Sequence, residues 1–95
     1  MKPILIALLF VASAACTTQL YTPTEANVNK VETASLAELQ QGHDLFQSKC
    51  GKCHKLPKPG KHSKDDWTKI LTKMAPKAKL TTEQHDLVYK YLVNN

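Results

Sequence analysis

The sequence predicts an all-α fold of about three helices, carried by residues 35–95 of the 95-residue chain. Three apolar patterns with helical spacing occur in this region, and each follows a capping residue. No segment there alternates between apolar and polar residues as a half-buried strand does. A core of about 60 residues seldom stabilises a domain alone, so a covalent or metal staple is also expected.

Residues 1–15 have the pattern of a secretory signal peptide. Lys2 supplies the charged start, residues 4–12 form a short apolar run, and small residues occupy the end of the segment. The run is too short for a permanent transmembrane helix. We therefore expect the mature protein to lie outside the cytoplasm.

Cys16 would become the first residue of the mature chain, and it is the odd one of three cysteines. Residues 13–16 resemble a bacterial lipobox, although Ser13 stands where that motif usually has leucine. The resemblance implies lipidation of Cys16 and a lipid anchor on the periplasmic side of a bacterial membrane. The alternative is ordinary cleavage nearby, leaving a free or intermolecularly paired thiol.

Residues 16–34 are predicted to comprise this anchor cysteine and a polar tether. The stretch from Thr17 to Thr33 is rich in threonine, contains Pro23 and lacks sustained periodicity. Fully extended, it would reach about 55–60 Å and lift the domain clear of the lipid surface. A strand at residues 28–31 is an alternative, but no partner strand is predicted.

The first predicted helix begins at Ser35, which forms a capping-box pattern with Glu38, and continues to about Lys49. A glycine inside a helix costs roughly 1 kcal/mol relative to alanine, so Gly42 indicates that another backbone crosses closely there. The residues that share the apolar face are Leu39, Gly42, Leu45 and Phe46.

The second predicted helix begins after Ser63 and should end just past Met74, because Pro76 disfavours helical geometry at Ala75. Its apolar stripe consists of Trp67, Ile70, Leu71 and Met74.

The third predicted helix is opened by a capping-box pattern at residues 81–84. Its predicted buried residues are Leu87, Val88, Tyr91 and Leu92.

Between the first two helices lies Cys50-Gly51-Lys52-Cys53-His54, the C-x-x-C-H signature of covalent haem attachment. One helical turn separates Cys50 from Cys53, so their sulfurs can form thioethers with the two vinyl groups of one haem c. His54 can then ligate the iron. A redox dithiol expects a βαβ context, and a zinc site expects four ligands at ordinary spacing, so both alternatives are less well supported.

Residues 35–95 resemble a small monohaem cytochrome c of the class I type, of the kind found as bacterial membrane-anchored electron carriers. The motifs that carry the resemblance are Gly42-x-x-x-Phe46, Cys50 to His54, Leu56-Pro57, Trp67-x-x-Ile70-Leu71-x-x-Met74 and Tyr91-Leu92. The family fold wraps a few helices round the haem, with the first and last helices crossing at the glycine and aromatic positions.

The resemblance also implies a methionine as the second axial ligand, and the mature chain offers only Met74. Many relatives have this methionine farther along the chain, in a loop. Met74 would otherwise simply complete the apolar stripe. His43, His62 and His85 are the competing ligands, and His62 is the best placed of them because its loop follows the haem motif. Pro57 is expected to present a carbonyl that orients the ring of His54.

All thirteen basic residues are lysines, and ten of them fall between Lys49 and Lys79, where the only acidic residues are Asp65 and Asp66. This imbalance would steer the protein toward an acidic docking surface on a redox partner. Nucleic acid is not an expected partner, because the chain has no arginine and few exposed aromatic residues.

These features predict a monomeric one-electron carrier rather than an enzyme, relaying electrons between redox partners outside the cytoplasm. The alternative is a haem protein with an open or displaceable sixth site, suited to gas binding or peroxidase-like chemistry. A distal pocket for such chemistry needs placed polar groups, whereas the stripe that ends at Met74 is apolar.

Overall fold

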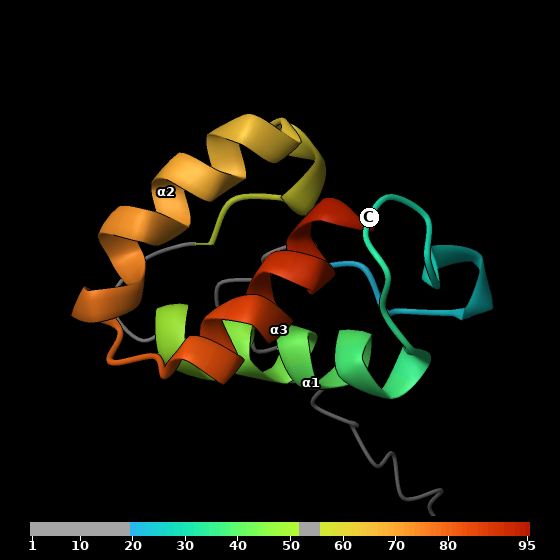
Figure 1. Cartoon of the computed structure of the whole chain (residues 1–95), viewed down its shortest axis with the longest axis horizontal. Coiled ribbons are helices and arrows are strands. Elements are labelled where there is room, and N and C mark those ends of the chain that lie inside the picture. Colours follow the sequence, from blue (N-terminus) through green and yellow to red (C-terminus); the bar gives the residue numbers. More distant parts are fainter. Residues whose placement is uncertain (1–19, 52–55) are drawn as a thin grey trace, which may run out of the picture.

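The computed structural model describes residues 20–51 and 56–95, and every regular element within them is helical (Figure 1). The helices are α1 (Leu36–Leu45), α2 (Lys64–Lys77) and α3 (Thr82–Val93). A π-helical turn (Phe46–Cys50) continues α1, and short 3₁₀ turns occur at Glu25–Asn27 and Pro59–Lys61. No helix among the described residues combines the length and the apolar character needed to span a bilayer. The predicted all-α class is confirmed for this part of the chain.

Helix α1 begins as the sequence predicts. The Ser35 hydroxyl accepts a hydrogen bond from the Glu38 amide at 3.1 Å, and the Glu38 carboxylate accepts one from the Ser35 amide at 3.0 Å. This reciprocal pair satisfies two of the amides that a helix start leaves without partners. The α-helical geometry ends at Leu45, earlier than predicted, and the π-helical turn takes the chain to Cys50.

Helices α1 and α3 cross at Gly42, as the sequence predicts (Figure 1). A side-chain carbon at Gly42 would overlap the carbonyl oxygen of Leu87 and would lie only 2.7 Å from Cβ of Tyr91. Glycine is therefore required by the close approach of the two backbones, not by its own dihedral angles. The crossing brings Leu39 and Tyr91, both fully buried, into the centre of the core.

Helix α3 supplies four of the eight buried residues in the main core cluster. Thr81 caps it, since its hydroxyl accepts a hydrogen bond from the Gln84 backbone amide at 3.1 Å and the Gln84 side-chain oxygen accepts one from the Thr81 backbone amide at 3.0 Å. Of the four residues predicted on its apolar face, all but the half-buried Leu87 are fully buried. Val93 and Asn94 extend the buried face to the end of the chain.

Helix α2 does not stop after Met74, and this prediction is wrong. It continues through Pro76 to Lys77 and closes with a Schellman motif in which the Lys79 amide donates to Pro76 and the Leu80 amide donates to Ala75. Lys79 adopts the left-handed conformation that this motif requires, with φ of 57°. Burial of Ala75 and the two closing hydrogen bonds outweigh the preference of a residue before proline for extended geometry.

The segment from Leu20 to Ala34 is folded onto the helices, although it belongs to the range predicted as a polar tether. The Tyr21 ring stacks on Tyr91, with ring centroids 4.4 Å apart and planes 8° from parallel. Each of these tyrosine hydroxyls donates a hydrogen bond to the carbonyl of the other residue. Pro23 and Ala34 are buried. The described part of the predicted tether is therefore part of the folded unit.

Asn94 joins this N-terminal segment to the end of α3. Its side-chain oxygen accepts hydrogen bonds from the amides of Val31, at 2.7 Å, and Glu32, at 3.1 Å, while its amide group donates to the Lys90 carbonyl at 2.7 Å. Asn94 is fully buried, so its satisfied polar group is an internal clamp and not a surface cap. In Figure 1 residues 24–33 accordingly lie beside the C-terminus.

Candidate functional site

An apolar cavity of about 220 Å³ lies between the π-helical turn, the loop that leads to α2, and α2 itself. Every wall residue in the described part of the chain is apolar or carries sulfur. The wall consists of Phe46, Cys50, Leu56, Pro57, Trp67, Ile70, Leu71 and Met74.

The π-helical turn brings Phe46 and Cys50 to the same side of this cavity. Both residues line it, Phe46 from the buried core and Cys50 from a half-buried position. A π-helical turn has i→i+5 hydrogen bonding and is often found at functional sites, because the extra residue changes the direction of the side chains that follow. The sequence-predicted attachment residue Cys50 thus faces an apolar space, as a bond to a hydrophobic cofactor would require.

The apolar stripe of α2 is divided between the core and the cavity. Trp67 and Leu71 are 1% and 2% exposed, whereas Ile70 and Met74 are only partly covered. All four line the cavity. Met74 therefore does not complete the packed core in the way the simplest interpretation of the stripe would require, and its thioether borders the same space as the Cys50 sulfur.

The loop beneath the cavity is held in place by Trp67. Its indole N–H donates a buried hydrogen bond of 2.8 Å to the Pro59 carbonyl. The Trp67 ring also packs edge-on against Phe46, with centroids 6.1 Å apart and planes at 87°. These contacts join the turn at Pro59 and the π-helical turn to α2, the elements that form the cavity wall.

The environment of Cys50 favours a protonated thiol. Burial raises the pKa of the Cys50 thiol above its ordinary value, because the thiolate would lose solvation. Reactive redox cysteines have the opposite property, a lowered pKa maintained by nearby positive charge or a helix start. The direction of this shift is therefore the opposite of the one that a redox-active cysteine requires.

Of the competing ligands, none of the three histidines lines the cavity. The His43 ring packs edge-on against Tyr91 and its Nδ1 pairs with Asp44 at 2.9 Å. His62 packs edge-on against Trp67, with centroids 4.8 Å apart, and His85 borders two threonine-lined depressions elsewhere. All three are half-buried.

The predicted basic face is exposed wherever the structure describes it. None of its described lysines is buried; they are Lys49, Lys58, Lys61, Lys64, Lys69, Lys73, Lys77 and Lys79. Lys64 pairs with Glu32, which lowers the pKa of that carboxyl and raises the pKa of the Lys64 amine.

Three predicted site residues, Cys16, Cys53 and His54, lie outside the described residues, and their roles stay predictions. No group of three histidine, cysteine or acidic side chains able to hold a metal ion occurs within residues 20–51 and 56–95.

The sequence analysis did not identify Phe46 and Leu56 as wall residues of the site. Phe46 was expected only at the helix crossing, and Leu56 only as part of the family pattern. The spacing of Phe46 and Cys50, four residues apart, was the available signal, since residues so spaced share a side of a helix. The hydrogen bond from Trp67 to Pro59 had no signal in the sequence.

Comparison of the chain with protein-family models, with curated proteins and with solved structures gives no match.

Proposed function

We propose that this protein is a membrane-anchored c-type cytochrome of the class I kind that carries single electrons between redox partners outside the cytoplasm. The observation that carries the proposal is that Cys50 and Met74 lie on the wall of one apolar cavity. They are respectively the first residue of a haem-attachment motif and the mature chain's only methionine.

The residues present fit a haem. Cys50 and Cys53 would hold it through thioethers, and His54 and Met74 would be the axial ligands of the iron. The described wall residues supply aromatic and aliphatic contacts and carry no charge. Its 220 Å³ volume is below the roughly 300–1,000 Å³ of ordinary ligand pockets, so the proposal requires that a bound porphyrin extend beyond the cavity.

The bound haem would supply a reversible one-electron couple, and the protein's contributions are distinct from it. Leu56, Trp67 and Leu71 exclude water, which keeps the charge change in a low-dielectric surrounding. A thioether opposite a histidine favours the reduced state more than a second histidine would. The carbonyl near Pro57 is the proposed acceptor for the second ring N–H of His54.

Catalysis or gas binding at an open sixth position is the less supported alternative. Such chemistry needs a hydrogen-bond donor beside the iron's free position. Within residues 20–51 and 56–95 the cavity wall offers apolar side chains, a thiol and a thioether, and none of the histidines described there lies on it. The proposed protein is therefore a carrier rather than an enzyme.

The cell location and the partners belong to the same proposal. The signal sequence and Cys16 would place the protein on the periplasmic side of a bacterial membrane, held by acyl chains. The exposed lysines around α2 would attract an acidic surface on the redox partner and accelerate encounter at low ionic strength.

Covalent attachment is tested by replacing Cys50 and Cys53 with alanine in the exported chain. The proposal predicts that denatured wild-type protein retains haem through its thioethers and that the double variant does not. A matched control, Cys16→Ala, should leave haem attachment unchanged and remove only the lipid. Haem retained covalently by the double variant would contradict the attachment sites.

Axial ligation is tested by Met74→Leu, with Ile70→Leu as the control on the same cavity wall. The near-infrared sulfur-to-iron band should disappear in the first variant and persist in the second. If Met74→Leu keeps the band and the reduction potential of the wild type, Met74 is not the ligand.

A further inference from the structure

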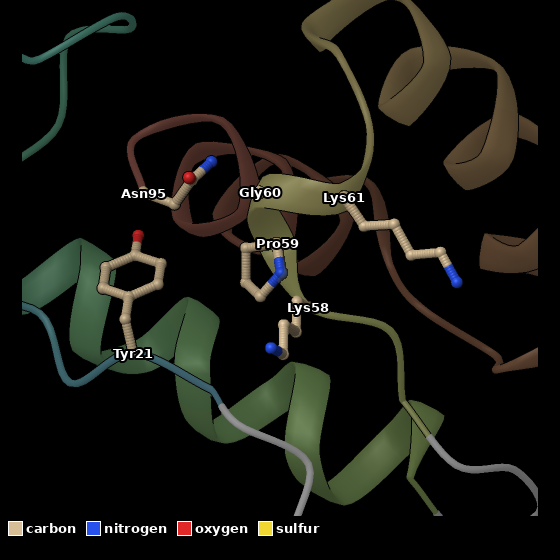
Figure 2. Close-up of a pocket in the computed structure, with 6 residues that line it drawn as sticks. All are labelled: Tyr21, Lys58, Pro59, Gly60, Lys61 and Asn95. Carbon is tan, nitrogen blue, oxygen red and sulfur yellow. The ribbon is translucent and has the colours of Figure 1, made fainter.

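The N-terminal segment and the turn at Pro59 together form a second depression, of about 440 Å³, on the surface. Figure 2 shows Tyr21 and Asn95 on one side of it and Lys58 with Pro59 on the other, while the Lys61 side chain extends outward from the turn. Two of its six lining residues are lysines and none is acidic. Neither lysine pairs with an acidic group in the described part of the chain.

This surface is rigid. The turn is closed by a hydrogen bond from the Lys61 amide to the Lys58 carbonyl at 3.0 Å, and the Pro59 carbonyl is held by the Trp67 indole at 2.8 Å. Tyr21 is fixed by its stack on Tyr91 and by the two reciprocal tyrosine hydrogen bonds. The positions of the lysines relative to Tyr21 are therefore set by the fold.

The covalent chain between the proposed anchor and this surface is short. Tyr21 is packed against the helices, and only five residue steps separate it from Cys16. Five steps span at most about 18 Å. The domain cannot then be lifted by the 55–60 Å that the sequence suggested, because Tyr21 must lie within this distance of the acyl chains.

We propose that the face formed by Tyr21, Lys58 and Lys61 rests on the phosphate groups of the membrane that carries the anchor. The inference rests on the proposed lipidation of Cys16. Each lysine close to an anionic bilayer contributes roughly fivefold to binding, so two contribute about thirtyfold. Such attraction is too weak to hold a free protein, but a short tether converts it into an intramolecular contact at high effective concentration.

The orientation has a consequence for electron transfer. The turn at Pro59–Lys61 directly precedes the first turn of α2, whereas Met74 and Lys77 belong to its last turn, so the two lie toward opposite ends of this helix (Figure 1). A domain that rests on Tyr21, Lys58 and Lys61 would present the Met74 end away from the lipid, where a redox partner can reach it.

Lysine labelling tests this surface in the lipidated holoprotein. The protein is incorporated into vesicles of phosphatidylcholine with or without phosphatidylglycerol and treated with a water-soluble acylating reagent. Mass spectrometry then gives the labelling rate of each lysine. In the anionic vesicles the rates at Lys58 and Lys61 should fall several-fold, whereas those at Lys73 and Lys77 should change little.

Matched variants distinguish docking of this face from a general loss of reagent access near the bilayer. Lys58→Gln should restore labelling of Lys61 toward its rate in neutral vesicles, and Lys73→Gln should not. Uniform labelling of all four lysines, or protection that appears only when an acidic redox protein is added, would overturn the membrane surface.

The mass of the mature chain is measured in the same samples. Acyl chains on Cys16 with unprotected Lys58 and Lys61 would refute the docking surface and leave the anchored carrier standing. A chain without acyl groups would refute the anchor and, with it, this surface. The haem spectrum is independent of both results.

Discussion

Replacement of Gly42 by alanine tests the helix crossing that supports the candidate site. On an isolated helix this change stabilises by about 1 kcal/mol, because alanine is the better helix former. Here the new methyl group would overlap the Leu87 carbonyl oxygen and lie 2.7 Å from Cβ of Tyr91, both in the facing helix. Neither atom belongs to the flexible end of a side chain, so α1 and α3 must separate.

Overpacking of this kind costs about 1–3 kcal/mol, and backbone contact places it at the upper end. After subtraction of the gain in helix propensity, we expect a net loss of about 2 kcal/mol in the free energy of unfolding. For a domain of this size that corresponds to a fall in Tm of about 10 °C.

The assay is thermal and urea unfolding of the holoprotein, followed by circular dichroism. Gln41→Ala, at the exposed neighbouring position of α1, is the control and should change stability by less than about 0.5 kcal/mol. If Gly42→Ala were as stable as the wild type or more so, helix propensity would outweigh the contact, and the close crossing of α1 and α3 would be refuted.

Four further predictions concern the clamp, the end of α2, acid stability and the charged face. Asn94→Ala should lower the free energy of unfolding by about 2 kcal/mol, because the amides of Val31 and Glu32 lose their hydrogen-bond acceptor. Faster hydrogen exchange at those two amides is the diagnostic result, and unchanged exchange would refute the clamp. Lys79→Gly should stabilise by about 1 kcal/mol in urea unfolding, since glycine adopts the left-handed conformation freely, whereas Lys77→Gly inside the helix should destabilise; equal effects would contradict the Schellman motif. Hydrogen bonds from the Lys90 amine and from the Ser35 backbone amide lower the pKa of the Glu38 carboxyl. The stability that the ionised carboxyl contributes is therefore present above its ordinary pKa of 4.5 and is lost as the pH falls through the lowered value. Glu38→Gln should flatten the acid limb of a stability–pH curve, and a limb of unchanged slope would show that these hydrogen bonds have no effect on stability. Rising ionic strength should slow oxidation of the reduced protein by anionic ferricyanide and accelerate oxidation by a cationic cobalt complex; rates that ignore salt would remove any steering role from the lysines.

The features that the sequence predicts correctly are local ones. The caps at Ser35 and Thr81 depend on residues three positions apart, and helical spacing identifies the buried residues of α3. Gly42 is an exception, because it predicts a contact between distant segments. A glycine inside a helical pattern is unfavourable for the helix itself, so its presence indicates that another backbone passes close by. Met74 was identified as a candidate from the family pattern, and its place on the cavity wall is a finding of the structure.

The features that the sequence does not predict depend on distant residues or on competing local preferences. Tyr21 contacts Tyr91, 70 residues away, and no pattern near Tyr21 indicates that partner. Asn94 resembles an ordinary helix-terminal asparagine until the positions of Val31 and Glu32 are known. Pro76 does disfavour helical geometry at Ala75, as the sequence predicts. Burial of Ala75 and the hydrogen bonds donated by the Lys79 and Leu80 amides outweigh this preference.

The most direct test of the central proposal is an optical spectrum of the purified protein, oxidised and reduced, extended into the near infrared and repeated with carbon monoxide. We expect a low-spin haem with the sulfur-to-iron band and no response to carbon monoxide, as a histidine and a methionine ligand require. A high-spin spectrum, or one that shifts with carbon monoxide, would contradict ligation by Met74 and favour the open sixth site. A protein without haem would contradict the proposed function altogether.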